Sequence, residues 1–342
     1  MRKALITGIT GQDGSYLAEL LLQKGYDVIG LDRRKAVVGR ENLQTVLHHK
    51  NFHIVEGELT EASRIRQIIE QEKPDELYHL ASQSLVPYSW VAPVYTTHVN
   101  AVGTLYLLDA IKQYSPLTRF YFASSSEIFG LIHEPFLHEL SYHHPRSPYA
   151  CAKSFGHNIT RNYRESYGLF CCNGILFNHE SERRGKEFIT RKVSSQVAEI
   201  ACGKRESLAV GNLESKRDWG YSPDYVDAMY RMLQKDMPDD YVIATGHPHS
   251  VRELVEFAFS SVGMSVEWKG SGLDEKGYCD GRMVVSVAKE FFRPAEVDIL
   301  CGDAAKAQIK LGWKPIVGFE EMIHRMVNYD MKQVQGEQYV YS

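Results

Sequence analysis

Strand-like and helix-like patterns alternate six times over about the first 180 residues of this chain. Short apolar runs predict buried strands, and apolar residues three or four positions apart predict helices. The predicted strands are 4–7, 27–31, 52–55, 76–80, 119–123 and 171–177, and the predicted helices are 14–24, 62–71, 99–112 and 147–167. Alternation of this kind is typical of an α/β fold with a doubly wound parallel sheet.

Beyond Phe177 the alternation loosens, and helical patterns separated by glycine and proline turns predict a second lobe. The predicted helices there are 186–202, 225–234, 251–262, 303–311 and 319–331. We therefore expect a Rossmann domain at 1–178 plus about 214–246, and a smaller, mostly helical C-terminal lobe at about 179–213 plus 247–342. The glycine-rich, charged segment 269–281 is predicted to be an exposed loop.

Composition restricts the class of partner. The 342 residues carry a formal net charge of -4, with 44% hydrophobic and 24% charged residues and no long basic block, which argues against nucleic acid or a membrane as the main partner. The N-terminus lacks a signal-peptide pattern and no apolar run is long enough to span a bilayer, so we expect a cytoplasmic protein. The six cysteines form no C-x-x-C pair, which predicts reduced thiols and no metal site.

Three glycines, Gly8, Gly11 and Gly14, follow the first predicted strand and open the first predicted helix. Glycines allow backbone N–H groups to approach a pyrophosphate, and the helix N-terminus adds positive potential. Asp32, at the end of the second strand, is followed by two arginines, Arg33 and Arg34. A carboxylate there typically binds the ribose of NAD, whereas arginines accommodate the 2′-phosphate of NADP, so the local pattern leaves both cofactors open.

Tyr149 and Lys153 stand four residues apart on one predicted helix and therefore share a face. Because a nearby ammonium favours a phenolate, we expect the pKa of Tyr149 to fall from about 10 toward working pH. Such a tyrosine can take the proton of an alcohol while a hydride leaves the same carbon. The pair follows a serine-rich strand end by about 25 residues, as in short-chain dehydrogenases.

That strand end reads FASSSEIFG, residues 122–130, and carries Glu127 among three hydroxyls. Burying a carboxylate is costly unless it is hydrogen bonded. Alcohol oxidation needs a serine hydroxyl with the tyrosine and lysine, but it does not need a second acid or base. Glu127 therefore indicates chemistry beyond hydride transfer, and removal of an acidified proton beside a ketone, which leads to dehydration, fits that requirement.

Several longer segments resemble the GDP-mannose 4,6-dehydratase family of the extended short-chain dehydrogenase/reductase superfamily. They are GITGQDGSYLAELLL, SSSEIFG, HPRSPYACAK, GILFNHES, RRGKEFITRK, KRDWGYSPDYV, YVIATG and FFRPAEVDILCGD. The resemblance implies a lyase that uses NADP, with NAD as the alternative, acts on a GDP-sugar and assembles as a homodimer or homotetramer. Other outcomes left open are the same dehydration of a different GDP-sugar such as a GDP-manno-heptose, an epimerase or reductase, and a non-catalytic scaffold.

The resemblance also implies roles for individual residues. Ser125, Glu127 and Tyr149 match the catalytic triplet, and Lys153 matches a lysine that serves catalysis and cofactor binding. Further cofactor contacts would be Gly8, Thr10, Gly11, Gln12, Asp13, Gly14, Asp32, Arg33, Arg34, Glu58, Leu59, Leu80, Ala81, Ser82, Gln83, Ser84, Tyr95, His179 and Arg184. Substrate contacts would be Ser84, Ser126, Asn178, Lys192, Arg217, Arg293 and Glu296.

The chain departs from the family pattern at a few of these positions. Ser125 replaces a usual threonine, which keeps the hydroxyl and loses a methyl group. Asp32 precedes the double arginine, Lys35-Ala36 replaces a serine pair, and residues 142–144 differ in a loop expected near the sugar. For Arg217 and Arg293 the alternative role is a structural ion pair with Asp218 or Glu296.

Overall fold

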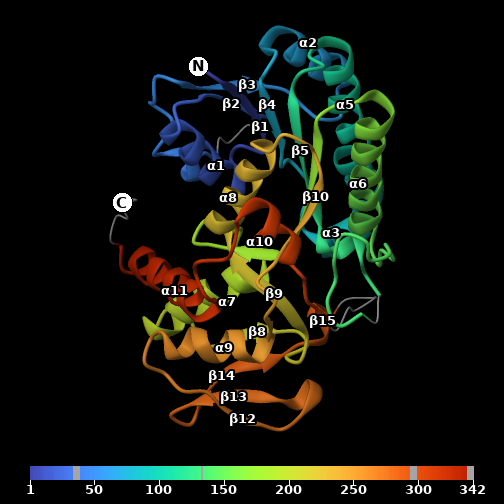
Figure 1. Ribbon diagram of the computed structural model, residues 1–342. Coiled ribbons are helices and arrows are strands. Elements are labelled where there is room, and N and C mark those ends of the chain that lie inside the picture. Colours follow the sequence, from blue (N-terminus) through green and yellow to red (C-terminus); the bar gives the residue numbers. More distant parts are fainter. Residues whose placement is uncertain (34–38, 132–133, 293–298, 337–342) are drawn as a thin grey trace.

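A computed structural model describes residues 1–33, 39–131, 134–292 and 299–336. Its largest element is a seven-stranded sheet in the order β10-β6-β5-β4-β1-β2-β3, with every neighbouring pair parallel (Figure 1). The strands are β1 (Lys3–Thr7), β2 (Asp27–Asp32), β3 (Phe52–Glu56), β4 (Glu76–His79), β5 (Arg119–Ser125), β6 (Cys171–Leu176) and β10 (Asp240–Ile243). The doubly wound fold and its six predicted strands are confirmed, and β10 is a strand that the alternation did not reveal.

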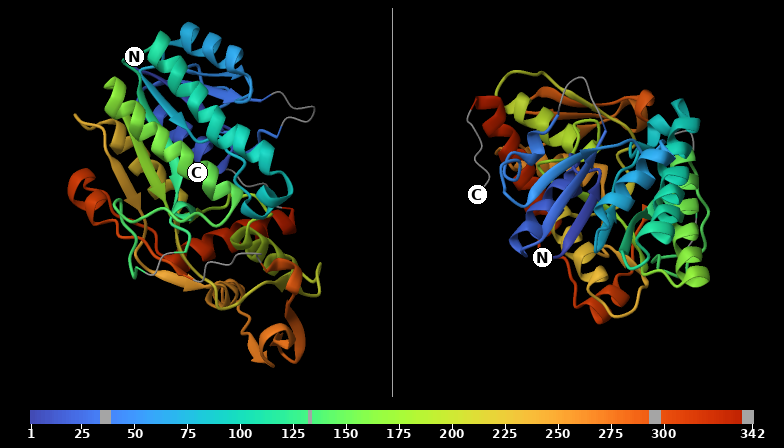
Figure 2. Two further views of the ribbon diagram at one scale, coloured as in Figure 1. Left: turned by 90° about the vertical axis from the view of Figure 1, so that its right-hand side faces the viewer. Right: turned by 90° about the horizontal axis from the view of Figure 1, so that it is seen from above.

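Helices cover both faces of this sheet (Figures 1 and 2). On one face α1 (Gln12–Gln23) packs against α8 (Ser222–Leu233). The other face carries α2 (Ala62–Glu72), α5 (Gly103–Tyr114) and α6 (Pro148–Tyr167). The predicted helix 99–112 is present, but its first turn, His98–Val102, is a π-helix. Two short helices, α3 (Val86–Val91) and α4 (Pro93–Thr97), precede it.

The order of the strands reverses between β1 and β4, since β2 and β3 lie on one side of β1 and the later strands on the other. Ligands of open parallel sheets bind outside the carboxyl ends of the strands at such a point. The glycine loop follows β1 and the segment 80–84 follows β4, so the structure brings these two predicted cofactor segments together.

The second lobe combines helices with two small four-stranded sheets. One sheet contains β7 (Asn178–Glu180), β9 (Lys216–Tyr221), β11 (Pro248–Ser250) and β15 (Ile299–Leu300), and the other contains β8 (Leu208–Val210), β12 (Glu267–Lys269), β13 (Lys276–Cys279) and β14 (Arg282–Val287). The sheets pack with α7 (Ile189–Ala201), α9 (Val251–Ser260) and α11 (Phe319–Gln335), while α10 (Ala305–Leu311) packs on β10 and α8.

The prediction of an exposed loop at 269–281 is wrong, because β13 lies inside this segment and pairs with both β12 and β14. The charged residues of this segment lie on the exposed side of a hairpin, and such a composition is also typical of a loop. The exact division of the chain between the two lobes stays a prediction: α8 and β10 belong with the large sheet, whereas β9 belongs to a small one.

A buried chain of side chains fixes the segment after β4. The Thr7 hydroxyl accepts hydrogen bonds from the backbone N–H groups of Leu80 (3.1 Å) and Ala81 (3.0 Å). Its own proton therefore points to His79 Nδ1, 2.8 Å away, and His79 Nε2–H donates to Thr104 (3.1 Å). This order requires a neutral imidazole, and burial lowers the pKa of His79 to about 3.

A second buried histidine lies behind the serine-rich strand end. His157 on α6 contacts the Ser124 hydroxyl through Nδ1 (3.2 Å) and the Asp240 carboxylate through Nε2 (3.8 Å). Arg164 holds the same carboxylate with two hydrogen bonds of 2.7 and 3.1 Å. Burial lowers the pKa of His157 to about 4, so this side chain is also neutral near pH 7.

From the lowered pKa values of His79 and His157 we predict that the folded protein loses stability in mild acid. Each has a folded pKa below its unfolded value of about 6.5, so the unfolded chain binds the extra protons and stability falls as the pH drops below about 6.5. For the pair we expect a loss of about 3 kcal/mol in the free energy of unfolding between pH 6.5 and 5. Urea unfolding at a series of pH values measures it.

The matched variants for this measurement are His157→Gln and, at an exposed position, His48→Gln. His157→Gln should remove about half of the slope between pH 6.5 and 5, whereas His48→Gln should leave it unchanged. An unaltered slope in His157→Gln would show that this histidine is not held neutral in the folded chain.

Candidate active site

A cavity of about 340 Å³ lies at the carboxyl ends of the large sheet and is closed from the other side by the second lobe. Residues from both lobes line it, and many of them were predicted as site residues from the sequence. These are Asp13, Leu80, Ser82, Ser84, Ser125, Ser126, Glu127, Tyr149, Lys153, Asn178, His179, Arg184, Lys192 and Arg217. The structure therefore brings the predicted catalytic residues together with part of each predicted binding set.

The four predicted catalytic residues come from three elements that contact one another. Strand β5 ends at Ser125 and the chain turns into a short 3-10 helix, Ser126–Ile128, in which the Glu127 N–H donates to Ser125 Oγ (3.2 Å). Tyr149 and Lys153 lie on the first turns of α6, whose N-terminus is capped by the Ser147 side chain. All four are buried, with Ser125 and Glu127 each about 9% exposed toward the cavity.

The electrostatics of this group differ from the expectation. Burial raises the pKa of Tyr149 to about 12, although a hydrogen bond with Ser125 acts in the opposite direction. Burial also lowers the pKa of Lys153 to about 7. The ammonium donates to the carbonyl of Ala123 (2.8 Å) and lies 5.9 Å from the centre of the Tyr149 ring. The prediction that Lys153 brings the phenol toward working pH is therefore wrong for these side chains alone.

The glycine loop is shaped for close backbone approach. Gly8 adopts a φ of +73°, and a Cβ atom there would lie 2.8 Å from the N atom of Ala81. A Cβ atom on Gly14 would lie 2.4 Å from the carbonyl oxygen of Gly8. Side chains are thus excluded at both positions, and the loop leads directly into the N-terminus of α1. This geometry fits a diphosphate group.

Other predicted cofactor residues lie outside this cavity. The Arg33 guanidinium donates to the hydroxyl of Tyr95 (3.0 Å), which links the end of β2 to α4. Glu58 accepts from the N–H of Leu59 (3.0 Å), and Leu59 is buried below Gly103. The carbonyl of Thr10 accepts from the Asn42 side chain, 3.2 Å away. Predicted residues Arg34, Arg293 and Glu296 fall outside the described residues.

Basic side chains line the part of the cavity formed by the second lobe. Arg184 Nε lies 3.0 Å from Glu180 Oε2, and the Lys192 ammonium lies 3.3 Å above the ring of Phe291. Burial lowers the pKa of Lys192. Arg217 Nη1 donates to the carbonyl of Lys216 (2.8 Å). Positive charge of this kind suits a second diphosphate.

Asp218, the predicted alternative partner of Arg217, has other partners that the sequence did not reveal. Its carboxylate accepts from the backbone N–H groups of Thr245 and Gly246 (both 2.8 Å) and from that of Gly302 (3.3 Å). Other cavity residues were also missed. They include Glu180, Glu187, Phe188, Gly211, Asn212, Ser215, Trp219 and Phe291. Five of them, Glu180, Glu187, Phe188, Trp219 and Phe291, lie in segments that carry the family resemblance, whereas Gly211, Asn212 and Ser215 carry no local signal.

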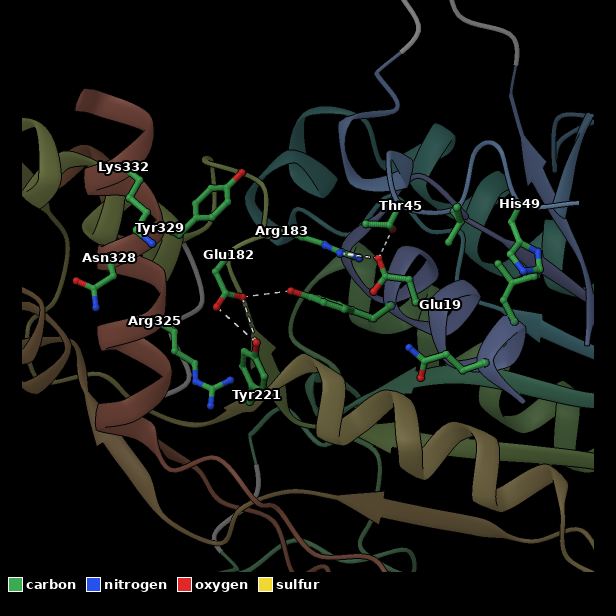
Figure 3. A pocket seen from close by; sticks show the side chains of 14 residues that line it. Glu19, Thr45, His49, Glu182, Arg183, Tyr221, Arg325, Asn328, Tyr329 and Lys332 are labelled. Atoms are coloured by element: carbon green, nitrogen blue, oxygen red, sulfur yellow. Dashed lines mark hydrogen bonds and ion pairs between the residues drawn. The ribbon is translucent and has the colours of Figure 1, made fainter. Parts of the chain in front are cut away.

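A second cavity of about 720 Å³ lies between α1 and α11 (Figure 3). Glu182 accepts there from the hydroxyls of Tyr16 (3.2 Å) and Tyr221 (3.3 Å), and Arg183 pairs with Glu19 at 2.7 Å. Since Asn178, His179, Glu180 and Arg184 line the first cavity, the segment 178–184 separates the two. The reactive side chains converge only on the smaller cavity, so we identify that one as the candidate active site.

The part of the chain that the structure describes contains neither a metal-binding cluster nor a membrane-spanning helix. No cluster of three or more histidine, cysteine, aspartate or glutamate side chains could hold a metal ion there. No helix among those residues combines the length and the apolar character needed to cross a membrane. All six cysteines are free thiols, four of them buried.

Solved structures of other proteins share the fold described above. Solved structures with the same fold include a UDP-glucose 4-epimerase of Thermus thermophilus in complex with NAD (26% identity, TM-score 0.80, covering 96% of this chain and 98% of that one). Another is a dTDP-glucose 4,6-dehydratase of Streptomyces venezuelae with NAD bound (23% identity, TM-score 0.83, covering 98% and 99%). At this level of identity the second resemblance supports the fold alone.

Sequence relatives are much closer. A GDP-mannose 4,6-dehydratase of Homo sapiens is 47% identical, with 96% of this chain and 91% of the relative covered. One from Vibrio cholerae is 45% identical, covering 98% of this chain and 95% of the relative. The family model described as GDP-mannose 4,6 dehydratase matches residues 5–326. With nearly its whole length matched in each comparison, this chain belongs to the GDP-mannose 4,6-dehydratase family.

Proposed function

We propose that this chain converts GDP-mannose to GDP-4-keto-6-deoxy-mannose by removing one molecule of water. The observation that carries the proposal is the presence of Glu127 in the same buried cavity as Ser125, Tyr149 and Lys153. Tyrosine, serine and lysine suffice to oxidise an alcohol, whereas elimination of water needs a further acid/base group. The names of the relatives, at 45–48% identity, support the same substrate.

The proposed cofactor is NADP. The cradle formed by Gly8, Gly14 and the N-terminus of α1 fits the diphosphate, and Arg33, held by Tyr95, would bind the 2′-phosphate. Asp32 in front of Arg33 keeps NAD as the alternative. When bound, the nicotinamide would accept the hydride released from C4 of the sugar and later return it to C6.

In the oxidising half of the cycle, Ser125 holds the 4-hydroxyl and Tyr149 takes its proton while C4 becomes a ketone. Burial keeps Tyr149 protonated in the free site. The phenolate therefore has to be stabilised by a charged Lys153 and by the positive charge of an oxidised nicotinamide. A pKa of about 7 leaves Lys153 partly charged near neutral pH, and a neighbouring carboxylate, Asp13, favours the charged form.

In the eliminating half, the C4 ketone acidifies the proton on C5. Glu127 removes this proton, the C5–C6 double bond forms, and the C6 hydroxyl leaves as water with the proton that Glu127 supplies. Ser126, which also lines the cavity, would assist the leaving hydroxyl. Addition of the hydride at C6 and of a proton at C5 completes a 4-keto-6-deoxy sugar. The sugar thus loses one water with no net change in the cofactor.

The GDP part of the substrate is proposed to lie against the second lobe, where Lys192, Arg217 and Asn178 face the cavity. The chain departs from the family pattern at residues 142–144, in a loop expected near the sugar, so a GDP-manno-heptose is the second candidate substrate. Comparing kcat/KM for the two GDP-sugars separates them.

We also propose that the protein acts as a homodimer or homotetramer. Light scattering of the purified chain measures the oligomeric state.

Substitution Glu127→Gln tests the central role. We expect water loss from GDP-mannose to fall by about 10²- to 10⁴-fold, because this change removes one general acid/base. Oxidation at C4 should continue in part, so reduced nicotinamide should accumulate and be visible in its absorbance. Product mass and absorbance are followed together after mixing with NADP⁺ and GDP-mannose.

The matched control is Glu320→Gln, which changes an exposed carboxylate on α11 and should dehydrate at the wild-type rate. Wild-type water loss in Glu127→Gln would exclude the proposed role of this carboxylate. A product of unchanged mass from the wild-type enzyme would instead indicate an epimerase or a reductase.

Cofactor choice gives a separate prediction. Arg33→Ala should weaken NADP⁺ binding by about tenfold or more, because it removes a charge-assisted contact to the 2′-phosphate. NAD⁺, which lacks that phosphate, should bind with affinity changed by less than about twofold. Isothermal titration with both nucleotides measures the ratio, and Arg282→Ala, at an exposed position on β14, is the control. Equal losses for both nucleotides would argue against Arg33 as the residue that selects NADP.

A further inference from the structure

The loop proposed to hold the cofactor diphosphate contains a carboxylate. Asp13 is the second residue of α1 and stands between Gly11 and Gly14. An acidic side chain stabilises a helix N-terminus, but it also repels a phosphate that approaches the same N–H groups. The resemblance to the family implied that Asp13 contacts the cofactor, which would place two negative groups together.

The structure shows a different partner for this carboxylate. Asp13 Oδ2 lies 2.8 Å from His179 Nε2, and His179 Nδ1 lies 2.7 Å from the carbonyl oxygen of Phe177. A carboxylate and a carbonyl both accept hydrogen bonds, so both ring nitrogens must carry a proton. With Asp13 ionised, as its lowered pKa indicates, this geometry makes His179 an imidazolium.

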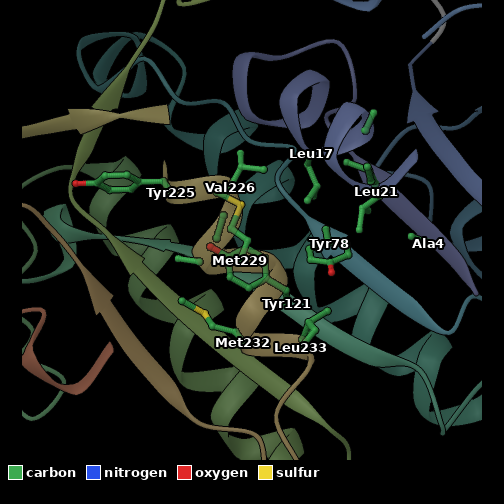
Figure 4. Packing of buried hydrophobic residues seen from close by; sticks show 14 of the residues in the cluster. Ala4, Leu17, Leu21, Tyr78, Tyr121, Tyr225, Val226, Met229, Met232 and Leu233 are labelled. Atoms are coloured by element: carbon green, nitrogen blue, oxygen red, sulfur yellow. The ribbon is translucent and has the colours of Figure 1, made fainter. Parts of the chain in front are cut away.

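Surrounding groups hold this ion pair in place. Tyr225 stacks on the imidazole with ring centres 4.7 Å apart, and it belongs to the apolar cluster that packs α8 on the large sheet (Figure 4). Ser222 donates to Asp13 Oδ1 (2.8 Å). Gln12 donates to the same oxygen (3.0 Å) and to the backbone carbonyl of His179 (3.0 Å).

The charge states agree with this arrangement. Burial by itself would raise the pKa of Asp13, but the charge and hydrogen bond of His179 hold it well below its usual range. Burial by itself would lower the pKa of His179, but Asp13 and the hydrogen bond to Phe177 outweigh burial and raise it. The titratable or charged groups near the imidazole are Asp13 from α1, Lys153 from α6, Glu180 from β7, Tyr225 from α8, and Arg184.

We propose that Asp13 is a positioning residue that keeps His179 protonated, so that the cofactor diphosphate meets an imidazolium instead of a carboxylate. The inference rests on the proposed function, because it takes a dinucleotide as the ligand of the glycine loop. Gln12 and Asp13 then have related roles, because both side chains bind the segment 178–181 of the second lobe. Asp13 contacts His179, and Gln12 also accepts a hydrogen bond from Ser181 (2.8 Å).

Substitutions at the two positions should therefore not be additive. His179→Gln keeps a hydrogen-bond donor for Asp13 but removes the positive charge, which leaves a buried carboxylate facing the diphosphate. We expect NADP⁺ binding to weaken by about tenfold or more. In the double variant Asp13→Asn/His179→Gln the carboxylate is gone, so affinity should recover by about threefold or more relative to His179→Gln.

Isothermal titration measures these affinities, with His48→Gln as the matched control at an exposed histidine. Adenosine 2′,5′-bisphosphate is the control ligand, because it carries the 2′-phosphate but lacks the bridging diphosphate. Its affinity should change by less than about twofold in every variant. If Asp13 contacted the cofactor directly, the double variant would bind NADP⁺ no more tightly than His179→Gln, and that result would overturn the inference.

A second measurement needs neither a variant that folds nor a cofactor. Nitrogen NMR of wild-type protein labelled with ¹³C and ¹⁵N should show both nitrogens of His179 protonated at pH 7.5, with the signal assigned by through-bond correlation to the backbone of the same residue. A neutral imidazole signal would overturn the inference while leaving the proposed function intact. Failure of the wild-type protein to bind either NADP⁺ or NAD⁺ would overturn the proposed function and the inference together.

Discussion

The hydroxyl of Thr7 stands at the point where the order of the large sheet reverses, and the site depends on it. Two backbone N–H groups that follow β4 have no strand partner there, and Thr7 accepts both. Its single proton must then go to His79, which fixes the tautomer of that ring and the direction of the next hydrogen bond. Gly8 packs against Ala81 at the same place. This contact and the Thr7 hydrogen bonds fix the position of the glycine loop relative to the segment 80–84.

Most of the fold could be predicted from the sequence because the large sheet is built from local patterns. Strands such as 119–123 are continuous apolar runs, and helices such as 147–167 show apolar residues at regular spacing. The second lobe is different. Strands β7, β11 and β15 have only two or three residues, which is too short for a period to be visible. Their positions depend on long-range contacts, such as those of the Asp218 carboxylate with Thr245 and Gly302.

The residues of the candidate site could be predicted from the sequence, but their charge states could not. Ser125, Glu127, Tyr149 and Lys153 could be named from spacing and from the resemblance to a family, and the structure places them in one cavity. Spacing does not reveal burial, however, and burial is what moves the pKa of Tyr149 upward and that of Lys153 downward. Nor could a local pattern show that Asp13 is held by His179, which is 166 positions away in the chain.

Under the proposed function, these charge states would make the order of the reaction steps depend on the bound cofactor. A buried Tyr149 with a pKa of about 12 and a Lys153 with a pKa of about 7 make a poor base by themselves. Positive charge close to both groups stabilises a phenolate, so in the proposed cycle proton removal would become favourable only with an oxidised nicotinamide bound. Without that positive charge Tyr149 would regain its affinity for the proton. In the proposed cycle the free site would therefore not deprotonate its sugar, and Glu127 would act as acid and base only after oxidation of C4.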